Sequence, residues 1–332
     1  MRARIVHAVI LLFPLGMTLF PGAQVGGLID AQALDSGQPP EKNSTRDSDS
    51  YRLRIPVNEI ELTFRAFNKN GAPLLQLAYS DLRLSDDGKQ QKQFVMLESF
   101  RDLPVRAGFI VDSSTSMAGH IKAARAIIQL YASQLFRKGT DQGFLMEFDS
   151  IAVLHHDWTA NPTDLFANAK SMARQPPGRL ALTSLYDSVY TACHDRWSQD
   201  HGSMTGNFIL LFSDGVDDDS RSYLSDAVDM CQRKRVTIYI ITFDRKSPFS
   251  SGQRNLAELA SETGGRVYFA PTNDELLQDL HAIDTEQRNQ FRLVYRPSAF
   301  KADGKFHRVK LQCNIRGAEI MTRSGYYQSL QP

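Results

Sequence analysis

The sequence has few cysteines and no excess of charge of either sign. Its 332 residues include three cysteines, and the formal net charge is +1 at pH 7. A chain this close to neutrality lacks the excess of basic residues that typically binds the phosphates of nucleic acid, so we do not expect a nucleic-acid partner. The spacings between Cys193, Cys231 and Cys313 match no zinc-binding pattern.

The odd number of cysteines leaves at least one thiol without a partner in the chain. Cys193 and Cys231 fall in two consecutive helices of the expected fold, which leaves open a disulfide between them. Buried free thiols are nevertheless the default interpretation, because cysteine is among the most buried residue types.

Familiar catalytic motifs are also missing. The sequence contains no Gly-x-Ser-x-Gly elbow, no Cys–His signature and no glycine loop that would cradle a phosphate. His155, His156 and Asp157 could suggest a metal site, but adjacent side chains of a strand point to opposite faces. We therefore interpret these three as ordinary hairpin residues, and we predict that the protein is not an enzyme.

One long apolar run is present, and it lies at the N-terminus. Arg2 and Arg4 precede the run at 5–20, and small residues follow it up to Ala23. This order is typical of an export signal, so residues 1–23 are predicted to be a signal peptide cleaved after Ala23. An uncleaved anchor is the alternative. We expect no membrane span in the mature chain and a secreted or periplasmic location.

The rest of the chain divides into four predicted parts. Residues 24–50 are polar and show no hydrophobic period, which indicates a flexible linker. Residues 51–103 alternate polar and apolar side chains between turn signals, as β-strands do. Residues 291–332 alternate in the same way. The two β segments flank one domain at 104–290, and we expect them to pair, since the ends of an inserted domain usually lie close together.

Residues 104–290 alternate short apolar strands with segments of helical periodicity. The predicted fold class is therefore α/β, a doubly wound and mostly parallel sheet, with a flanking β subdomain built from the N- and C-terminal strands. Two strands, at 142–149 and 151–158, follow each other too closely for a crossover helix. They are predicted to form a hairpin at a sheet edge.

Oxygen-bearing side chains follow the predicted strands at the points where these end. Asp112, Ser114 and Ser116 come after the strand at 107–112, and Asp214 follows the apolar strand at 207–212. Thr183 lies where a later loop meets a helix, and the neighbouring Ser184 is the alternative at that point. Ligands of doubly wound sheets bind at the carboxyl ends of the strands, so we expect these side chains to lie together.

Five hard oxygen ligands suit Mg²⁺, with Mn²⁺ or Ca²⁺ as alternatives, and do not suit zinc, which favours histidine and cysteine. Only two of the five, Asp112 and Asp214, carry a formal charge. A bound ion would keep residual positive charge and could accept a carboxylate from outside. The acidic run 217–219 is interpreted as a solvated loop rather than a second metal site.

These motifs together resemble the von Willebrand factor A-type domain with its metal-ion-dependent adhesion site. The family pattern is Asp-x-Ser-x-Ser, then a threonine, then an aspartate before glycine; here it reads DSSTS at 112–116, Thr183, and Ser-Asp-Gly at 213–215. The resemblance spans about residues 104–290. The flanks are similar to those of secreted bacterial proteins with this domain, through DLRLSDDGKQQKQF before it and RSGYY after it.

The resemblance implies an exported adhesion or binding module that depends on a metal ion. Its partner would be a protein that contributes an acidic side chain, with the loops around Thr115, Met117 and Val216 shaping the contact. The final helix at 273–289 could also move when the site is occupied. A metal-dependent hydrolase, and a structural domain that has lost metal-dependent binding, are the alternatives.

Overall fold

The computed structural model describes residues 58–300 and 303–327, except for 173–181, 198–203, 244–249 and 270–272. The predicted signal peptide and linker lie outside the described residues. Within the described ranges, no helix is both long enough and apolar enough to cross a membrane.

A six-stranded sheet forms the centre of the α/β part, in the order β10-β9-β8-β5-β6-β7. The strands are β5 (Val105–Asp112), β6 (Gln142–Phe148), β7 (Ala152–Thr159), β8 (Gly206–Phe212), β9 (Thr237–Thr242) and β10 (Val267–Phe269). Neighbouring strands are parallel except β7, which pairs antiparallel with β6 at the edge. This confirms the predicted hairpin and the predicted α/β fold class.

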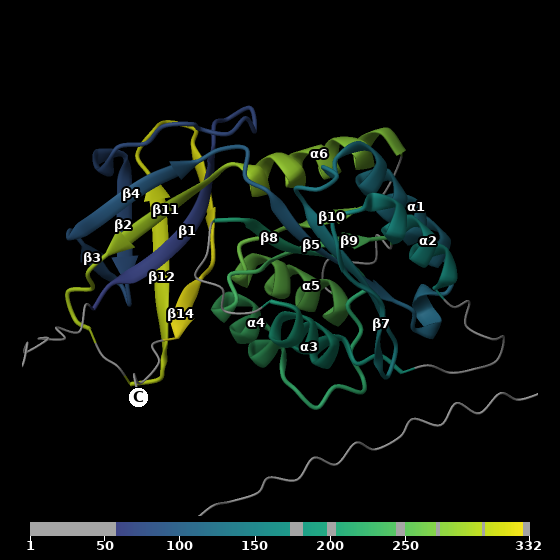
Figure 1. The fold of residues 1–332 in the computed structure, drawn as a ribbon. Helices are drawn as coiled ribbons and strands as arrows, with labels where there is room; N and C mark the ends of the chain where they lie inside the picture. Colours follow the sequence, from purple (N-terminus) through teal and green to yellow (C-terminus); the bar gives the residue numbers. More distant parts are fainter. Residues whose placement is uncertain are drawn as a thin grey trace, which may run out of the picture. The chain divides into compact units, whose positions relative to one another are not determined.

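Helices cover both faces of this sheet (Figure 1). They are α1 (Ile121–Gln134), α2 (Pro162–Ser171), α3 (Leu185–Arg196), α4 (Leu224–Arg233), α5 (Ser251–Glu262) and α6 (Asn273–Arg288). α1, α2 and α6 pack on one face, and α3, α4 and α5 on the other, each set over its own apolar cluster. The central strands are buried on both faces, which explains why β8 is a continuous apolar run instead of an alternating one.

A disulfide joins Cys193 of α3 to Cys231 of α4. The default expectation of free thiols was therefore wrong for these two residues, and Cys313 is the free cysteine. The bond became available because α3 and α4 pack side by side on the same face of the sheet. Disulfides persist in oxidising compartments, so this bond agrees with the expectation of export.

The flanking strands form two antiparallel sheets around a shared core. One has the order β13-β1-β11-β4 and the other β14-β12-β2-β3. The strands are β1 (Ile60–Phe67), β2 (Leu82–Asp86), β3 (Lys89–Gln91), β4 (Phe94–Phe100), β11 (Gln290–Tyr295), β12 (Phe306–Cys313), β13 (Glu319–Thr322) and β14 (Gly325–Tyr327). N-terminal strands thus pair with C-terminal ones, as in Leu62↔Leu293.

The chain enters and leaves the α/β part at one place. The backbone N–H of Leu103 donates to Arg288 O at 3.0 Å, and Arg288 Nη1 donates back to Leu103 O at 3.1 Å. The buried Arg288 also forms an ion pair with buried Asp141 at 2.7 Å. This junction lies before β5, so the opposite ends of the parallel strands are free to carry a site.

Candidate metal centre

Asp112 is the last residue of β5 and is fully buried. β5 runs parallel to β8, with Val111 opposite Phe212, so the loop after each strand begins at the same edge of the sheet. Both oxygens of the Asp112 carboxylate accept hydrogen bonds: Oδ1 from the backbone N–H of Ser114 at 2.9 Å, and Oδ2 from Ser213 Oγ at 2.7 Å. The carboxylate is therefore held in one orientation.

The environment of Asp112 is unfavourable to a lone negative charge. Burial raises its pKa to about 6, although hydrogen bonds from Ser114 and Ser213 oppose the rise, and the nearby charge of Asp214 adds to it. Two neighbouring carboxylates in a water-poor place repel each other, and a cation would relieve both the burial cost and the repulsion. The donor set thus fits a hard divalent ion.

The loop after Asp112 turns at once into the 3₁₀ helix η2 (Thr115–Met117). Ser114 is buried and Ser116 exposed, and their hydroxyl oxygens lie 3.3 Å apart. Thr115 is exposed, as a partner-contacting residue must be. Met117 is only 1% exposed, because the tight turn directs its side chain into the interior. Met117 therefore packs inside the loop, and a contact between its side chain and a partner stays a prediction.

Thr183 is buried, and its backbone is held on both sides by the loop after β8. Its N–H donates to Asp218 Oδ1 at 2.6 Å, and its carbonyl accepts from the N–H groups of Asp218 and Asp219. The Ser184 hydroxyl donates to Ser150 O at 3.2 Å, and Ser150 lies in the turn between β6 and β7. Of the two neighbours, Thr183 is therefore better suited to face an ion.

The acidic run 217–219 has a structural role that sequence reasoning missed. Asp218 and Asp219 are exposed, as predicted for a solvated loop, but their side chains bind Thr183 and Ser184. Asp217 accepts hydrogen bonds from Tyr186 N and Ser220 Oγ. These contacts fix the Thr183 loop against the loop that carries Asp214. No pattern in the sequence signals such pairs, because their partners lie more than thirty residues apart.

Asp214 is buried in the loop after β8, and its Oδ1 accepts from Val216 N at 3.2 Å. The next residue, Gly215, has a φ of +82°, and a Cβ atom there would lie 2.2 Å from Gly252 O. Only glycine allows this loop to pack so closely against the first turn of α5. Val216, in the same loop as Asp214, is 40% exposed.

The histidines of β7 do not form a metal pair. His155 Nε2 lies 2.7 Å from Glu147 Oε2 on β6, whereas His156 Nδ1 lies 2.6 Å from the carbonyl of Asp157. The two rings therefore have separate partners, in agreement with their interpretation as hairpin residues.

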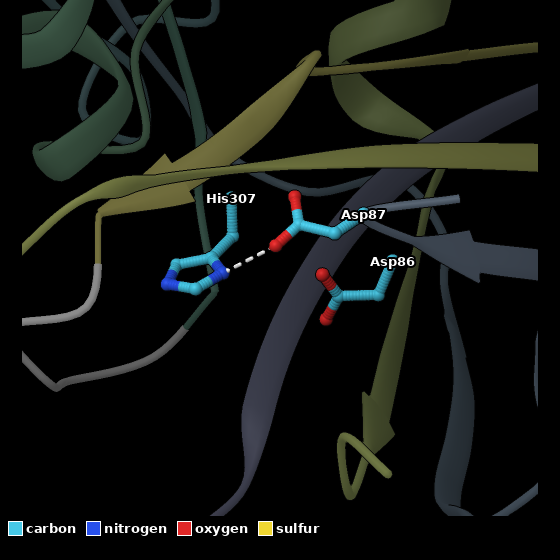
Figure 2. A group of neighbouring side chains, drawn as sticks. All are labelled: Asp86, Asp87 and His307. Atoms are coloured by element: carbon cyan, nitrogen blue, oxygen red, sulfur yellow. Dashed lines mark hydrogen bonds and ion pairs between the residues drawn. The ribbon is translucent and has the colours of Figure 1, made fainter. Parts of the chain in front are cut away.

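A second group of metal-ligating residue types lies in the antiparallel sheets. Asp86, Asp87 and His307 present ligand atoms within 4.8 Å of one another (Figure 2). His307 Nδ1 lies 2.8 Å from Asp87 Oδ2, and its Nε2 lies 3.3 Å from Asp303 Oδ1. A ring with a carboxylate at each nitrogen favours the protonated form, which has no lone pair for a metal.

We therefore interpret His307, together with Asp87 and Asp303, as a clamp on the β2–β3 turn. Burial lowers the pKa of His307, but its hydrogen bonds to Asp87 and Asp303 and their charges outweigh burial, so the pKa is raised. Asp86 belongs to a different network, since its Oδ2 accepts from Tyr295 and Tyr326.

The clamp predicts a pH dependence of stability. Because the folded-state pKa of His307 is above its unfolded value, its contribution is complete below about pH 6.5 and is lost as the pH rises through the folded-state pKa. Replacing His307 by Gln should therefore cost more unfolding free energy at pH 6 than at pH 9. We expect a difference of roughly 0.5–1 kcal/mol, since Asp87 is half-exposed.

Urea unfolding of wild type and His307→Gln at both pH values measures this difference. His281→Gln, at an exposed position on α6, is the matched control and should show no such pattern. An equal cost at both pH values would contradict the clamp.

Comparison with known proteins identifies the family. A sequence profile of the von Willebrand factor type A domain matches residues 108–283, more than half of the chain. The protein therefore belongs to the von Willebrand factor type A domain family. Domains of this family are typically interaction modules that bind protein ligands, which supports a metal-dependent binding module at family level.

Solved structures with a similar fold were also found. BatB, a conserved hypothetical protein from Bacteroides thetaiotaomicron, is 14% identical, with a TM-score of 0.44 over 54% of this chain and 97% of its own. An aerotolerance-related membrane protein from Bacteroides fragilis is 14% identical, with a TM-score of 0.44. The match covers 55% of this chain and 98% of that protein.

Proximal thread matrix protein 1 from the mussel byssus was solved with zinc in its metal-ion-dependent adhesion site (MIDAS) motif. It is 13% identical, with a TM-score of 0.44, and the match covers 56% of this chain and 48% of that protein. No curated protein sequence gives a significant match.

Proposed function

We propose that the protein is an exported module that binds a protein partner through a divalent cation. Mg²⁺ is the proposed ion, with Mn²⁺ or Ca²⁺ as alternatives. The proposed ligands are Asp112, Ser114, Ser116, Thr183 and Asp214. The observation that carries the proposal is the buried Asp112 carboxylate, which lies near a second carboxylate, Asp214, at the carboxyl ends of two adjacent parallel strands.

Binding without catalysis fits the surroundings of this carboxylate. A metal-assisted hydrolase needs a general base placed beside the ion. The described groups that donate to Asp112 are a serine hydroxyl and a backbone N–H, and neither can act as a base at neutral pH. The ion would instead orient a ligand and accept its charge.

The loops around the proposed ion carry exposed apolar side chains. Ile151 is 70% exposed, Leu182 is 48% exposed and Val216 is 40% exposed. Ser150 Oγ donates to Leu182 O, and Asp218 N donates to Thr183 O, so the three loops are in contact. A partner with a carboxylate flanked by apolar residues would match this surface, with Thr115 also exposed beside it.

The location of the protein is proposed on two grounds. The apolar N-terminal run followed by small residues supports export, and the Cys193–Cys231 bond is typical of proteins outside the reducing cytoplasm. A periplasmic or secreted location follows.

The test is capture of a partner from extracellular material, followed by measurement of its affinity. We expect binding in Mg²⁺, and a loss of at least tenfold in EDTA or with Asp214→Ala. Ile151→Asp should weaken binding while leaving the effect of Mg²⁺ on protein stability unchanged, since this side chain contacts the partner and not the ion. Equal affinity with Mg²⁺, with EDTA and for Asp214→Ala would refute an ion-dependent interface.

A further inference from the structure

A small cavity lies where the antiparallel sheets meet the α/β part. It has a volume of about 20 Å³. Its walls include three arginines and three threonines, namely Arg65, Arg235, Arg323, Thr63, Thr237 and Thr263. Within the described part of the chain, no acidic side chain lines it. The wall is therefore rich in hydrogen-bond donors and in positive charge.

Arg65, on β1, is 4% exposed, yet the acceptors that it contacts are neutral. Its Nη1 donates to Thr237 Oγ1 at 2.9 Å, and its Nη2 donates to Gly264 O. Its Nε is buried and has no hydrogen-bond partner among the residues that the structure describes. A buried guanidinium without a counter-charge is costly, because the hydration that it loses on burial is not replaced by an ion pair.

Arg323, in the loop before β14, is half-buried, and the acceptors that it contacts are also neutral. Its Nη1 donates to Gln232 O at 3.1 Å and its Nη2 to Glu61 O at 2.9 Å, so both acceptors are backbone carbonyls. Its Nε is also buried, and no residue in the described ranges accepts a hydrogen bond from it. Burial and the nearby positive charge of Arg235 lower its pKa to about 10, which is a sign of the strain on this charge.

The carboxylate of Glu61, whose charge acts on Arg323, is already engaged. Glu61 forms an ion pair with the exposed Arg235, at 3.0 Å between Oε1 and Nη1. Three positive charges thus line the cavity, and the ion pair with Glu61 offsets that of Arg235. We propose that this cavity binds a monovalent anion, chloride under physiological conditions, which accepts hydrogen bonds from the arginine donors.

The size of the cavity limits which anions fit. About 10–15 Å³ is needed for one water-sized particle, so a volume of 20 Å³ holds a single small ion. This favours a monatomic anion such as chloride over sulfate and phosphate, which have five heavy atoms each. An anion here would join β1 and Arg323 of the antiparallel sheets to α4 and β9, and so fasten the two parts of the fold together.

Chloride should therefore stabilise the full-length protein more than an anion that cannot enter. We expect the wild-type Tm to be about 2–4 °C higher in sodium chloride than in sodium gluconate of equal ionic strength. Bromide should act like chloride, and sodium sulfate should show no saturable effect. Chloride-35 NMR should show excess line broadening in the presence of the protein, and bromide should remove it by competition.

Arg323→Gln and Arg65→Met should abolish both the chloride-specific Tm difference and the line broadening. Arg296→Gln is the matched control, because this arginine lies in the same sheet region but is exposed and paired with Glu59. It should behave like wild type. If either cavity variant fails to fold, the chloride and gluconate comparison and the bromide competition in wild type still decide the question. Identical Tm values in chloride and gluconate, with no line broadening, would show that the cavity holds only water, which Gln232 Oε1 could bind.

Discussion

Millimolar Mg²⁺ is expected to raise the Tm of the wild-type protein, and Asp112→Ala is expected to abolish that increase. A ligand that binds only the folded state adds RT ln(1 + [L]/Kd) to its stability, or about 2.7 kcal/mol at a hundredfold excess over Kd. Asp112 is the buried carboxylate of the proposed site, so its loss removes charge and geometry together. Thermal unfolding in Mg²⁺ and in EDTA measures the effect.

The relevant quantity is the Mg²⁺-induced change within each variant, because removing a buried carboxylate also alters the stability of the metal-free protein. Asp102→Ala is a suitable control. Asp102 is an exposed carboxylate before β5, at the opposite end of the strand, where it pairs with Arg137. This variant should keep the full Mg²⁺ effect. A wild-type Tm that responds neither to EDTA nor to Mg²⁺ would rule out the proposed ion.

Ending the chain at Gln290 is expected to destroy cooperative folding. The truncation removes β11, which lies between β1 and β4, and β12, which lies between β14 and β2. Leu62, Phe64 and Leu84, each at most 1% exposed, would lose much of their cover. At about 1.5–3 kcal/mol for each large apolar side chain, the loss approaches the roughly 5–15 kcal/mol that stabilises a typical protein.

Aggregation during purification and a broad, non-cooperative urea transition are the expected signs of this loss. A chain that ends at Tyr327 is the control, since it keeps β11 to β14 and should unfold like wild type. If residues 51–290 formed a soluble fragment that unfolds cooperatively, the C-terminal strands would not be needed for the fold.

The sequence carried enough information to predict the sheet and the edge at which the proposed site lies. The apolar runs that end at Asp112 and before Ser213 could be recognised because strands of a doubly wound sheet are buried on both faces. The pairing of the flanks was also predictable, because both alternate and both border the inserted domain. These features depend on local periodicity, which one sequence displays directly.

Other features depend on contacts between loops that are far apart in the sequence, and such contacts produce no periodic pattern of residues. The Ser213 hydroxyl that orients Asp112 and the Asp218 carboxylate that fixes Thr183 are examples. The disulfide depended on how two helices pack, which spacing alone does not determine. For Met117 a signal was present, since an apolar residue directly after four hydroxyl-bearing ones is better placed inside than outside.

The order of pairing in the antiparallel sheets has a consequence for how the protein is made. Ile60 pairs with Tyr295, and Leu84 with Leu311, so these N-terminal strands must wait until nearly the whole chain has been produced. Sheets built from such distant contacts form slowly, and unpaired apolar strands are prone to associate with other chains in the meantime. The α/β part, whose parallel strands lie between them in sequence, can fold first and bring the two halves of each sheet together through the junction of Leu103 and Arg288.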